Sequence, residues 1–388
     1  MTESDYIKGC DEGVVPAPPR LVLMTADPIG GVWTYVLELA RGLSVFGVEV
    51  ALATMGQPLS QEQRREVADE GNVTLYESGY RLEWMDDPWA DVERSGAWLL
   101  ELEDRLRPDL VHLNGYAHAA LPWQNPCLVV AHSCLLSWWQ AVRREDLPSR
   151  YQQYRQRVTR GLAAADLVAA PSAAMLQNIQ KLYLPLPDGR VVHNARSRTR
   201  FRPGHKQDFI LSVGRVWDEA KNIGALVRNA YDLPWPVYVA GEINHPGGGS
   251  VTMDGVNRLG FLSPDELAPW YAAASVYALP ARYEPFGLTV LEAALSGCAL
   301  VLGDIPSLRE LWDGAALFVD PDSPDQLQEE LCRLCADRAR QESLGNKALA
   351  QSRKFTAAKM VAGYLSLYRQ LCRENRAGNR EPQLAEKL

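Results

Sequence analysis

The stretch from residue 275 to residue 302 constrains the fold of this chain most strongly. Its two ends, 275–279 and 298–302, are short apolar runs that are typical of buried β-strands. Between these runs, leucines recur at helical spacing, at Leu288, Leu291 and Leu295. Gly297 follows the last leucine and is well placed to end a helix. The stretch therefore predicts strand, loop, helix and strand, which is the repeating unit of a parallel α/β sheet.

The loop before this helix carries residues that suit ligand binding. It lies at the carboxyl end of a strand, where open α/β sheets bind ligands. Pro285 disfavours helix at Glu284, so we expect Glu284 in the loop and a helix that begins near Phe286 or Gly287. The first N–H groups of a helix have no partner inside it and attract phosphate. Glu292, inside the helix, is suited to accept hydrogen bonds from sugar hydroxyls, so the whole stretch fits a nucleotide sugar.

The segment 284–292 has the sequence EPFGLTVLE. It resembles the E-x7-E motif of retaining glycosyltransferases of family 4, which have the GT-B fold. Two glutamates at this spacing are common by chance, but the Pro, Phe and Gly between them make the match more specific. The resemblance implies two Rossmann-like, doubly wound parallel-sheet domains that face each other across a cleft. It also implies that the donor nucleotide lies mainly on the second domain and the acceptor on the first.

Length and composition agree with an enzyme of this kind. The chain has 388 residues, which favours two domains, and its net charge of −8 argues against general nucleic-acid binding. No apolar run reaches the ~18 residues of a membrane span, and the N-terminus lacks the apolar core of a signal peptide. The cysteines are scattered and odd in number, which fits a reducing compartment. We therefore expect a cytoplasmic protein, and we assign it no cofactor.

The first half of the chain begins with a strand, a glycine turn and a helix, as a doubly wound sheet does. Gly30 and Gly31 form the turn between a strand at 20–25 and a helix at 32–46. Glycines let the backbone approach a ligand closely, although this turn is not the G-x-G-x-x-G fingerprint of dinucleotide binding. The resemblance implies that both glycines face the donor diphosphate. The alternative is a simple tight turn.

Three histidines lie near the predicted ligand edge of this half. His132 directly follows the apolar strand run 127–131. The family resemblance places a histidine there, close to the donor sugar, and we expect a catalytic role for His132. For His112 and His118 we consider contact with the acceptor, but a lone histidine is more often structural.

The second half repeats the alternation, and its first loop carries two cations. A strand at 209–213 precedes Arg215 and Lys221. The resemblance implies that this pair binds the donor diphosphate and neutralises the leaving group. Arg clamps two phosphate oxygens, whereas Lys acts as a point charge. The alternative is two ordinary surface cations.

The resemblance also implies a role for each matched position. We expect Arg215 and Lys221 on the diphosphate, Glu292 on the ribose, and Glu284 on the sugar hydroxyls. The predicted catalytic residues are Glu284, His132, Arg215 and Lys221. The predicted donor-binding residues are Gly30, Gly31, Arg215, Lys221, Leu262, Glu284, Phe286, Gly287, Leu288, Thr289 and Glu292. Leu262 belongs to a loop that holds the nucleobase through backbone groups in the family. No D-x-D motif occurs in a fitting context, so we expect no metal.

A basic segment runs from Arg143 to Arg160, with six arginines against Glu145 and Asp146. Such a segment suits weak peripheral contact with an anionic membrane or a lipid-phosphate acceptor. The alternative, which we favour, is a solvated helix face.

We predict five parts in chain order: a tail at 1–19, an acceptor domain at 20–198, a donor domain at 199–355, a closing helix at 356–374 that crosses back to the acceptor domain, and a polar tail at 375–388. The expected function is sugar transfer, with retention, from a UDP-, GDP- or ADP-linked donor to a saccharide, lipid-linked or small-molecule acceptor. The alternatives are a GT-B nucleotide-sugar hydrolase or epimerase, and a non-catalytic subunit that binds sugar nucleotides.

Overall fold

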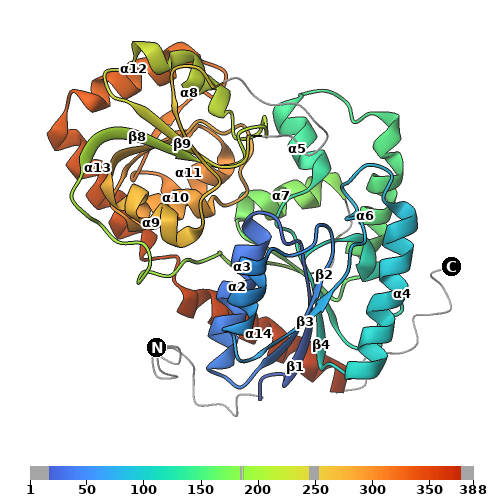
Figure 1. Ribbon diagram of the computed structural model, residues 1–388. Coiled ribbons are helices and arrows are strands. Elements are labelled where there is room, and N and C mark those ends of the chain that lie inside the picture. Colours follow the sequence, from blue (N-terminus) through green and yellow to red (C-terminus); the bar gives the residue numbers. More distant parts are fainter. Residues whose placement is uncertain (1–16, 184–185, 187, 244–252, 377–388) are drawn as a thin grey trace.

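The computed structural model describes residues 17–183, 186, 188–243 and 253–376. The predicted tails at 1–19 and 375–388 therefore lie almost entirely outside the described residues. Two α/β domains stand side by side, each built around one parallel sheet (Figure 1). The prediction of two Rossmann-like domains is confirmed.

The N-terminal sheet is parallel throughout and has the strand order β3-β2-β1-β4-β5-β6-β7. Its strands are β1 (Leu21–Ala26), β2 (Glu49–Thr54), β3 (Val73–Glu77), β4 (Leu110–Leu113), β5 (Cys127–Val130), β6 (Leu167–Ala170) and β7 (Gly189–Val191). The central strands β4, β5 and β6 are buried along their whole length. This explains their continuous apolar sequence, because both faces of a parallel sheet are covered by helices.

The C-terminal sheet is also parallel and has the order β10-β9-β8-β11-β12-β13. Its strands are β8 (Gln207–Val213), β9 (Val237–Ala240), β10 (Asn257–Gly260), β11 (Ala274–Leu279), β12 (Ala299–Gly303) and β13 (Leu317–Val319). The strand–loop–helix–strand unit expected at 275–302 is present as β11, a loop, a helix and β12.

Most of the helices connect successive strands, and the last three follow the final strand. In the N-terminal half they are α2 (Gly31–Ser44), α3 (Gln61–Ala68), α4 (Trp89–Leu106), α5 (Leu135–Val142), α6 (Gln152–Ala164) and α7 (Ala173–Leu182). In the C-terminal half they are α8 (Ile223–Asn229), α9 (Pro264–Ala273), α10 (Leu288–Leu295), α11 (Pro306–Trp312), α12 (Pro324–Cys335), α13 (Arg338–Ser352) and α14 (Ala357–Arg376). Within the described ranges, none of the helices has the length and apolarity needed to span a membrane.

The last helix, α14, packs on the N-terminal domain, although it follows the C-terminal domain in sequence (Figure 1). Tyr364 and Tyr368 are fully buried in the core that also holds Val36 of α2. Helices α14 and α2 approach each other closely, because a Cβ on Gly42 of α2 would lie 2.2 Å from Cγ2 of Val361 in α14. Helix α14 therefore meets the N-terminal domain at a point where α2 has no side chain.

One helix start differs from the sequence-based expectation. Helix α10 begins at Leu288, one or two residues later than expected, because Gly287 has a φ of 85° and closes a turn before the helix.

Candidate active site

The loops that carry the predicted ligand residues lie where each sheet reverses its strand order. Strand β1 lies between β2 and β4, and β8 lies between β9 and β11. Loops that leave the carboxyl ends of such neighbouring strands diverge and open a crevice between them. The loop with Gly30 follows β1, the loop with Arg215 follows β8, and the loop with Glu284 follows β11. Three predicted segments are therefore gathered at these two crevices.

Glu284 and Lys221 are in direct contact in the C-terminal domain. Lys221 Nζ lies 2.6 Å from Glu284 Oε2, and both side chains are mostly buried. The other oxygen of the carboxylate, Oε1, accepts from the N–H of Gly287 at 2.9 Å and from the N–H of Phe286 at 3.4 Å. Ser307 Oγ donates to the backbone carbonyl of Glu284 at 2.5 Å. The loop is therefore held by Lys221, by the N–H groups that precede α10 and by Ser307.

These contacts change one detail of the predicted site. We expected the N–H groups of Phe286 and Gly287 to have no hydrogen-bond acceptor within the protein, but both donate to Glu284. The carboxylate is negatively charged and therefore takes the position that the positive end of a helix favours for an anion. Next to it, Thr289 Oγ1 lies 2.8 Å from the hydroxyl oxygen of Tyr277, which also lies 3.3 Å from the carbonyl oxygen of Val213, and this contact fixes the threonine side chain.

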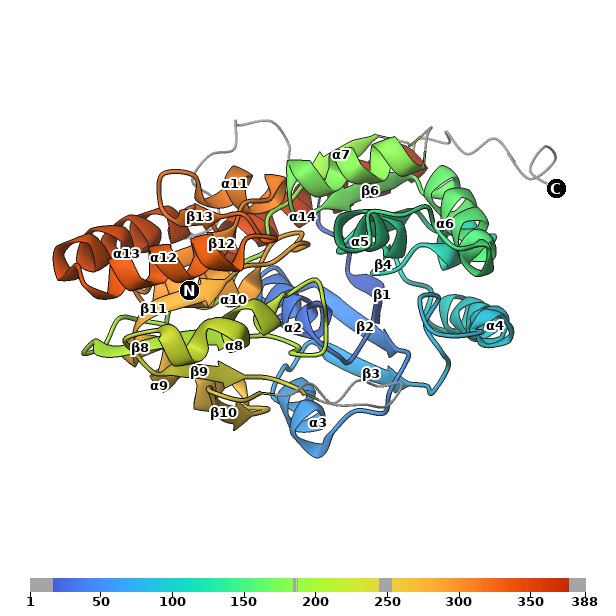
Figure 2. The same ribbon diagram turned by 90° about the horizontal axis from the view of Figure 1, so that it is seen from above.

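The two glycines of the first loop face the C-terminal domain. A Cβ on Gly30 would lie 3.8 Å from Arg215 Nη1, and a Cβ on Gly31 would lie 3.4 Å from Leu288 Cδ1. Gly30 also has a φ of 83°, a conformation that other residues rarely adopt. The view from above shows α2 and α10, which begin at these loops, next to each other where the domains meet (Figure 2). The fold therefore brings together the predicted donor residues of both domains.

Asp218, which the sequence analysis did not select, holds Arg215. Its Oδ2 lies 2.8 Å from Arg215 Nη2, and its Oδ1 accepts from the indole N–H of Trp138 at 3.1 Å. Burial acts to raise the pKa of Asp218, but the charges of Lys221 and Arg215 and the hydrogen bonds from Trp138 and the Ala220 N–H together hold the pKa below its usual value. Trp138 belongs to α5 of the facing domain. The position of Asp218 between two predicted cations was a local signal for this role.

Glu292 is buried and contacts Arg196, which the sequence analysis also did not select. Arg196 Nε donates to Glu292 Oε1 at 2.6 Å. Burial raises the pKa of Glu292, whereas Arg196 acts to lower it. Among the remaining predicted donor residues, Leu262 packs against the core of the C-terminal domain.

His132 lies at the carboxyl end of β5 and is half-buried. Its Nε2 lies 2.7 Å from Asn114 Oδ1, and the side-chain amide of Asn114 donates to the carbonyl of Thr25. Burial lowers the pKa of His132 to about 3, so the ring is neutral at pH 7. A neutral ring with a fixed hydrogen-bond partner has a defined tautomer and orientation.

The acceptor role considered for His112 and His118 is wrong. Both rings are buried and have hydrogen-bond partners inside the domain. His112 Nδ1 lies 2.7 Å from the hydroxyl of Tyr368, and His118 Nε2 lies 2.9 Å from Ser95 Oγ. They are core histidines that join packed elements.

Asp27 lies in the loop after β1 and is a further titratable group near the donor cations. Its Oδ1 accepts from the N–H of Ile29 at 2.9 Å. Burial raises the pKa of Asp27 to about 6, although the Ile29 N–H and the charge of Arg215 act to lower it. A carboxyl group with such a pKa gains or loses its charge when the pH changes by about one unit around 6.

The loop of Glu284 is also attached to the N-terminal domain. The hydroxyl of Tyr283 accepts from the N–H of Cys134 at 3.2 Å, and Ser172 Oγ donates to the carbonyl of Pro285 at 2.7 Å. Glu310 accepts from the first two N–H groups of α7, those of Ala173 and Ala174, at 2.8 and 2.7 Å. Contacts of this kind fix how the two sides of the cleft face each other.

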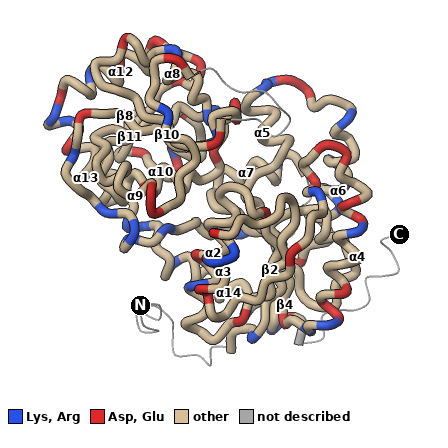
Figure 3. The backbone as a smooth tube through the Cα atoms, viewed as in Figure 1, with Lys and Arg blue, Asp and Glu red and all other residues tan. Residues whose placement is uncertain are grey.

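The basic segment is partly neutralised. Arg143 pairs with Glu219 and Arg144 with Asp322, both in the C-terminal domain. Arg157 pairs with Glu93. Basic and acidic residues are interspersed along the chain in both domains (Figure 3). These pairs agree with a solvated surface that also contributes to the contact between the domains.

Two family models match the chain, one on each half. The model described as Glycosyltransferase Family 4 matches residues 29–199, and the model described as Glycosyl transferases group 1 matches residues 207–337. The chain is 28% identical to a D-inositol 3-phosphate glycosyltransferase of Xylanimonas cellulosilytica, over 88% of this chain and 92% of the relative. A shorter match, 29% identical over 30% of each chain, is to the O-antigen chain mannosyltransferase B of Escherichia coli.

Solved structures share the fold at low sequence identity. The sucrose-phosphate synthase of Thermosynechococcus elongatus superposes with a TM-score of 0.76 at 18% identity, over 91% of this chain and 99% of that structure. The Anabaena protein HepE, in complex with UDP and glucose, superposes with a TM-score of 0.71 at 13% identity, over 90% and 99%. With these matches and two facing parallel-sheet domains, the chain belongs to the GT-B glycosyltransferases that join a family 4 domain to a group 1 domain.

Proposed function

We propose that the protein transfers a sugar from a nucleoside diphosphate sugar to an acceptor hydroxyl with retention at the anomeric carbon. The observation that carries this proposal is the pairing of Lys221 with Glu284 at 2.6 Å beside the start of α10. In this arrangement Lys221 and Arg215 bind the diphosphate, and Glu284 accepts hydrogen bonds from the donor sugar. The N–H groups of Phe286 and Gly287 hold Glu284, so the N–H of Leu288 and the hydroxyl of Thr289 complete the phosphate site.

The reaction needs no protein base in this proposal. The bond between the anomeric carbon and the phosphate oxygen breaks, and the departing oxygen takes the proton of the acceptor hydroxyl. That hydroxyl oxygen forms the new bond on the same face of the sugar. Arg215 and Lys221 stabilise the negative charge that develops on the diphosphate, which is the principal electrostatic demand of the step. The two side chains supply positive charge at the leaving group, so we propose that transfer proceeds without a metal ion.

The known proteins set the order in which substrates are tested. The related Anabaena structures contain UDP, UDP-glucose, or UDP with glucose, so UDP-linked donors come first and GDP- and ADP-linked donors follow. Relatives that cover most of the chain are named D-inositol 3-phosphate glycosyltransferases, so D-inositol 3-phosphate is the first acceptor to test. Saccharide and lipid-linked acceptors follow. Weak membrane contact through Arg143 to Arg160 is tested with anionic vesicles.

The test combines binding with product analysis. Thermal unfolding is measured with UDP, GDP and ADP, because a ligand that binds only the folded protein raises its stability. With the donor class known, the anomeric configuration of the product is read by NMR, with and without EDTA. Retention in the presence of EDTA is the expected result. Inversion at the anomeric carbon contradicts the proposed retention. Loss of activity with EDTA contradicts the proposal that transfer needs no metal ion.

Two alternatives are separated by the same assay. A hydrolase or an epimerase consumes the donor efficiently when no acceptor is present. A non-catalytic subunit binds the nucleotide but gives no product with any acceptor. The Lys221–Glu284 pair and the fixed position of Arg215 favour transfer over simple binding.

A further inference from the structure

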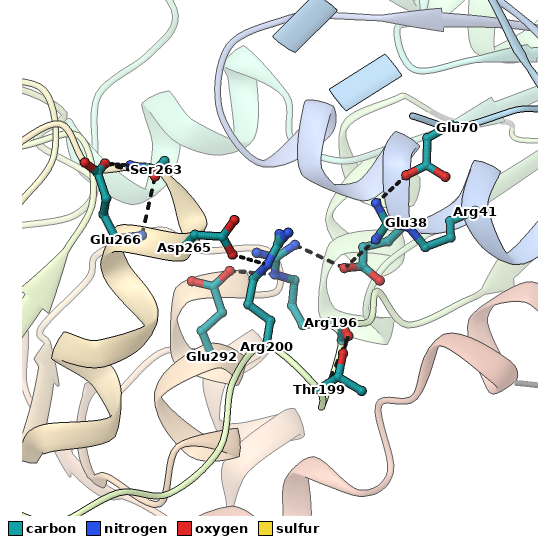
Figure 4. Close-up of polar contacts among 11 residues, drawn as sticks. Glu38, Arg41, Glu70, Arg196, Thr199, Arg200, Ser263, Asp265, Glu266 and Glu292 are labelled. Atoms are coloured by element: carbon teal, nitrogen blue, oxygen red, sulfur yellow. Dashed lines mark hydrogen bonds and ion pairs between the residues drawn. The ribbon is translucent and has the colours of Figure 1, made fainter. Parts of the chain in front are cut away.

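A buried charge cluster joins the two helices that begin at the donor loops. Helix α2 begins at Gly31 and α10 at Leu288, and these two residues approach each other across the domain junction. Glu38 lies about two turns into α2, and Glu292 lies just over one turn into α10. Figure 4 shows both carboxylates pointing toward Arg196, which lies in the segment between the two sheets.

Arg196 contacts both glutamates at once. Its Nε lies 2.6 Å from Glu292 Oε1, and its Nη1 lies 3.3 Å from Glu38 Oε1. The side chains of Arg196, Glu38 and Glu292 are only 4%, 5% and 7% exposed. Glu38 also lies near Arg41, which in turn contacts Glu70. The cluster therefore includes a residue from each domain and one from the segment that connects them.

Two carboxylates buried this close together repel each other unless a cation lies between them. Burial raises the pKa of Glu292, the charge of Arg196 acts to lower it, and the charge of Glu38 acts to raise it. Buried ionic clusters seldom stabilise a fold more than well-packed apolar side chains do. Stability alone is thus a weak reason for this cluster, and the geometry it imposes is the stronger one.

We infer that Arg196 is a positioning residue for the donor site, which directs the carboxylate of Glu292 and sets the spacing between the starts of α2 and α10. This inference rests on the proposed function and on the role predicted from the sequence for Glu292, which is to accept hydrogen bonds from the ribose hydroxyls. Arg196 itself touches no substrate in this arrangement. Its effect reaches the ligand through Glu292 and through the facing donor loops.

The test compares two arginines of the same connecting segment. Arg196→Met removes the buried cation at similar length. Arg200→Met is the matched control, because Arg200 forms a more exposed pair with Asp265, at 2.9 Å. Calorimetry gives the Kd of the diphosphate that binds best among UDP, GDP and ADP, and the Kd of its 2′,3′-dideoxy form. The ratio of the two Kd values reports the ribose contact, and loss of stability alone does not change this ratio.

We expect the wild-type protein and Arg200→Met to prefer the ribose form by about tenfold, the usual effect of hydrogen bonds to a charged group. We expect Arg196→Met to reduce the preference to within about twofold. Arg196→Lys keeps the charge and is expected to give an intermediate ratio. This variant takes the place of Arg196→Met if Arg196→Met fails to fold. A preference equal to wild type in Arg196→Met, or in Arg196→Lys where Met does not fold, overturns the inference. A wild-type protein that binds none of the three nucleotides overturns the proposed function, and the inference falls with it.

Discussion

Lys221 Nζ lies 2.6 Å from Glu284 Oε2, although the two residues are 63 positions apart in the sequence. They meet because their loops follow β8 and β11, which are neighbours in the C-terminal sheet. The pair holds the Glu284 carboxylate in a fixed orientation beside the cations that we assign to the diphosphate. Each residue therefore fixes the position of the other before any substrate binds.

Glu284→Gln is expected to abolish most transfer while leaving the fold intact. Glutamine has nearly the same shape but loses the charge that pairs with Lys221, and such contacts in a reacting site are worth roughly 10²–10³ in kcat. Steady-state kinetics and thermal unfolding check this together. Glu219→Gln, on an exposed carboxylate of the neighbouring loop, serves as the control. Near-normal turnover by Glu284→Gln contradicts the role of this residue.

Trp138→Phe is expected to weaken donor binding, raising KM about fivefold. The substitution removes the indole N–H that donates to Asp218, and a hydrogen bond of this kind is worth ~1 kcal/mol. Asp218 then holds Arg215 less firmly. The control is Trp139→Phe, because the indole N–H of Trp139 has no hydrogen-bond partner among the described residues. Equal effects of the two substitutions show that the hydrogen bond to Asp218 is irrelevant.

Glu310→Ala is expected to loosen the contact between the domains. Glu310 caps the first N–H groups of α7 from the other domain, and loss of a cap costs about 1 kcal/mol. Small-angle X-ray scattering should show a larger radius of gyration, and kcat should fall. Asp313→Ala, whose exposed carboxylate pairs with Arg309 one turn away, provides the comparison. An unchanged radius of gyration in Glu310→Ala refutes a role for this cap in closing the cleft.

Acid pH is expected to destabilise the protein through His112. Burial lowers the pKa of His112 to about 3, and the charge of His132 acts in the same direction. The unfolded chain binds a proton near pH 6.5, so the stability of the folded state is fully present above that pH and falls as the pH decreases toward 3. Between pH 7 and pH 5 the loss for one such histidine is ~2 kcal/mol.

Urea unfolding at pH 7 and pH 5 measures this loss. His112→Gln should show a smaller decrease in the free energy of unfolding than the wild type. His205→Gln, at an exposed position, should behave as the wild type does. A decrease that is the same in all three proteins rules out His112 as the source.

The sequence by itself determined the order of strands and helices and the edge of the sheet at which the predicted ligand residues lie. The apolar runs at 275–279 and 298–302 and the leucines between them required a strand–loop–helix–strand unit, so Glu284 had to follow a strand. The same reasoning located Arg215 and His132. Such features follow from local periodicity, because a side chain at the end of a buried strand has few other places to lie.

Only the tertiary structure decided which distant residues compensate each buried charge. Glu292 looked like a ligand residue, and the fold adds Arg196 and Glu38 to its surroundings. His112 looked accessible at a strand end, and α14 covers it with Tyr368. Local patterns set exposure only on average, since the partners come from segments that are brought together by packing of the whole chain. The physical reason is that a charge or ring is stabilised by what surrounds it in space, which the neighbouring sequence does not contain.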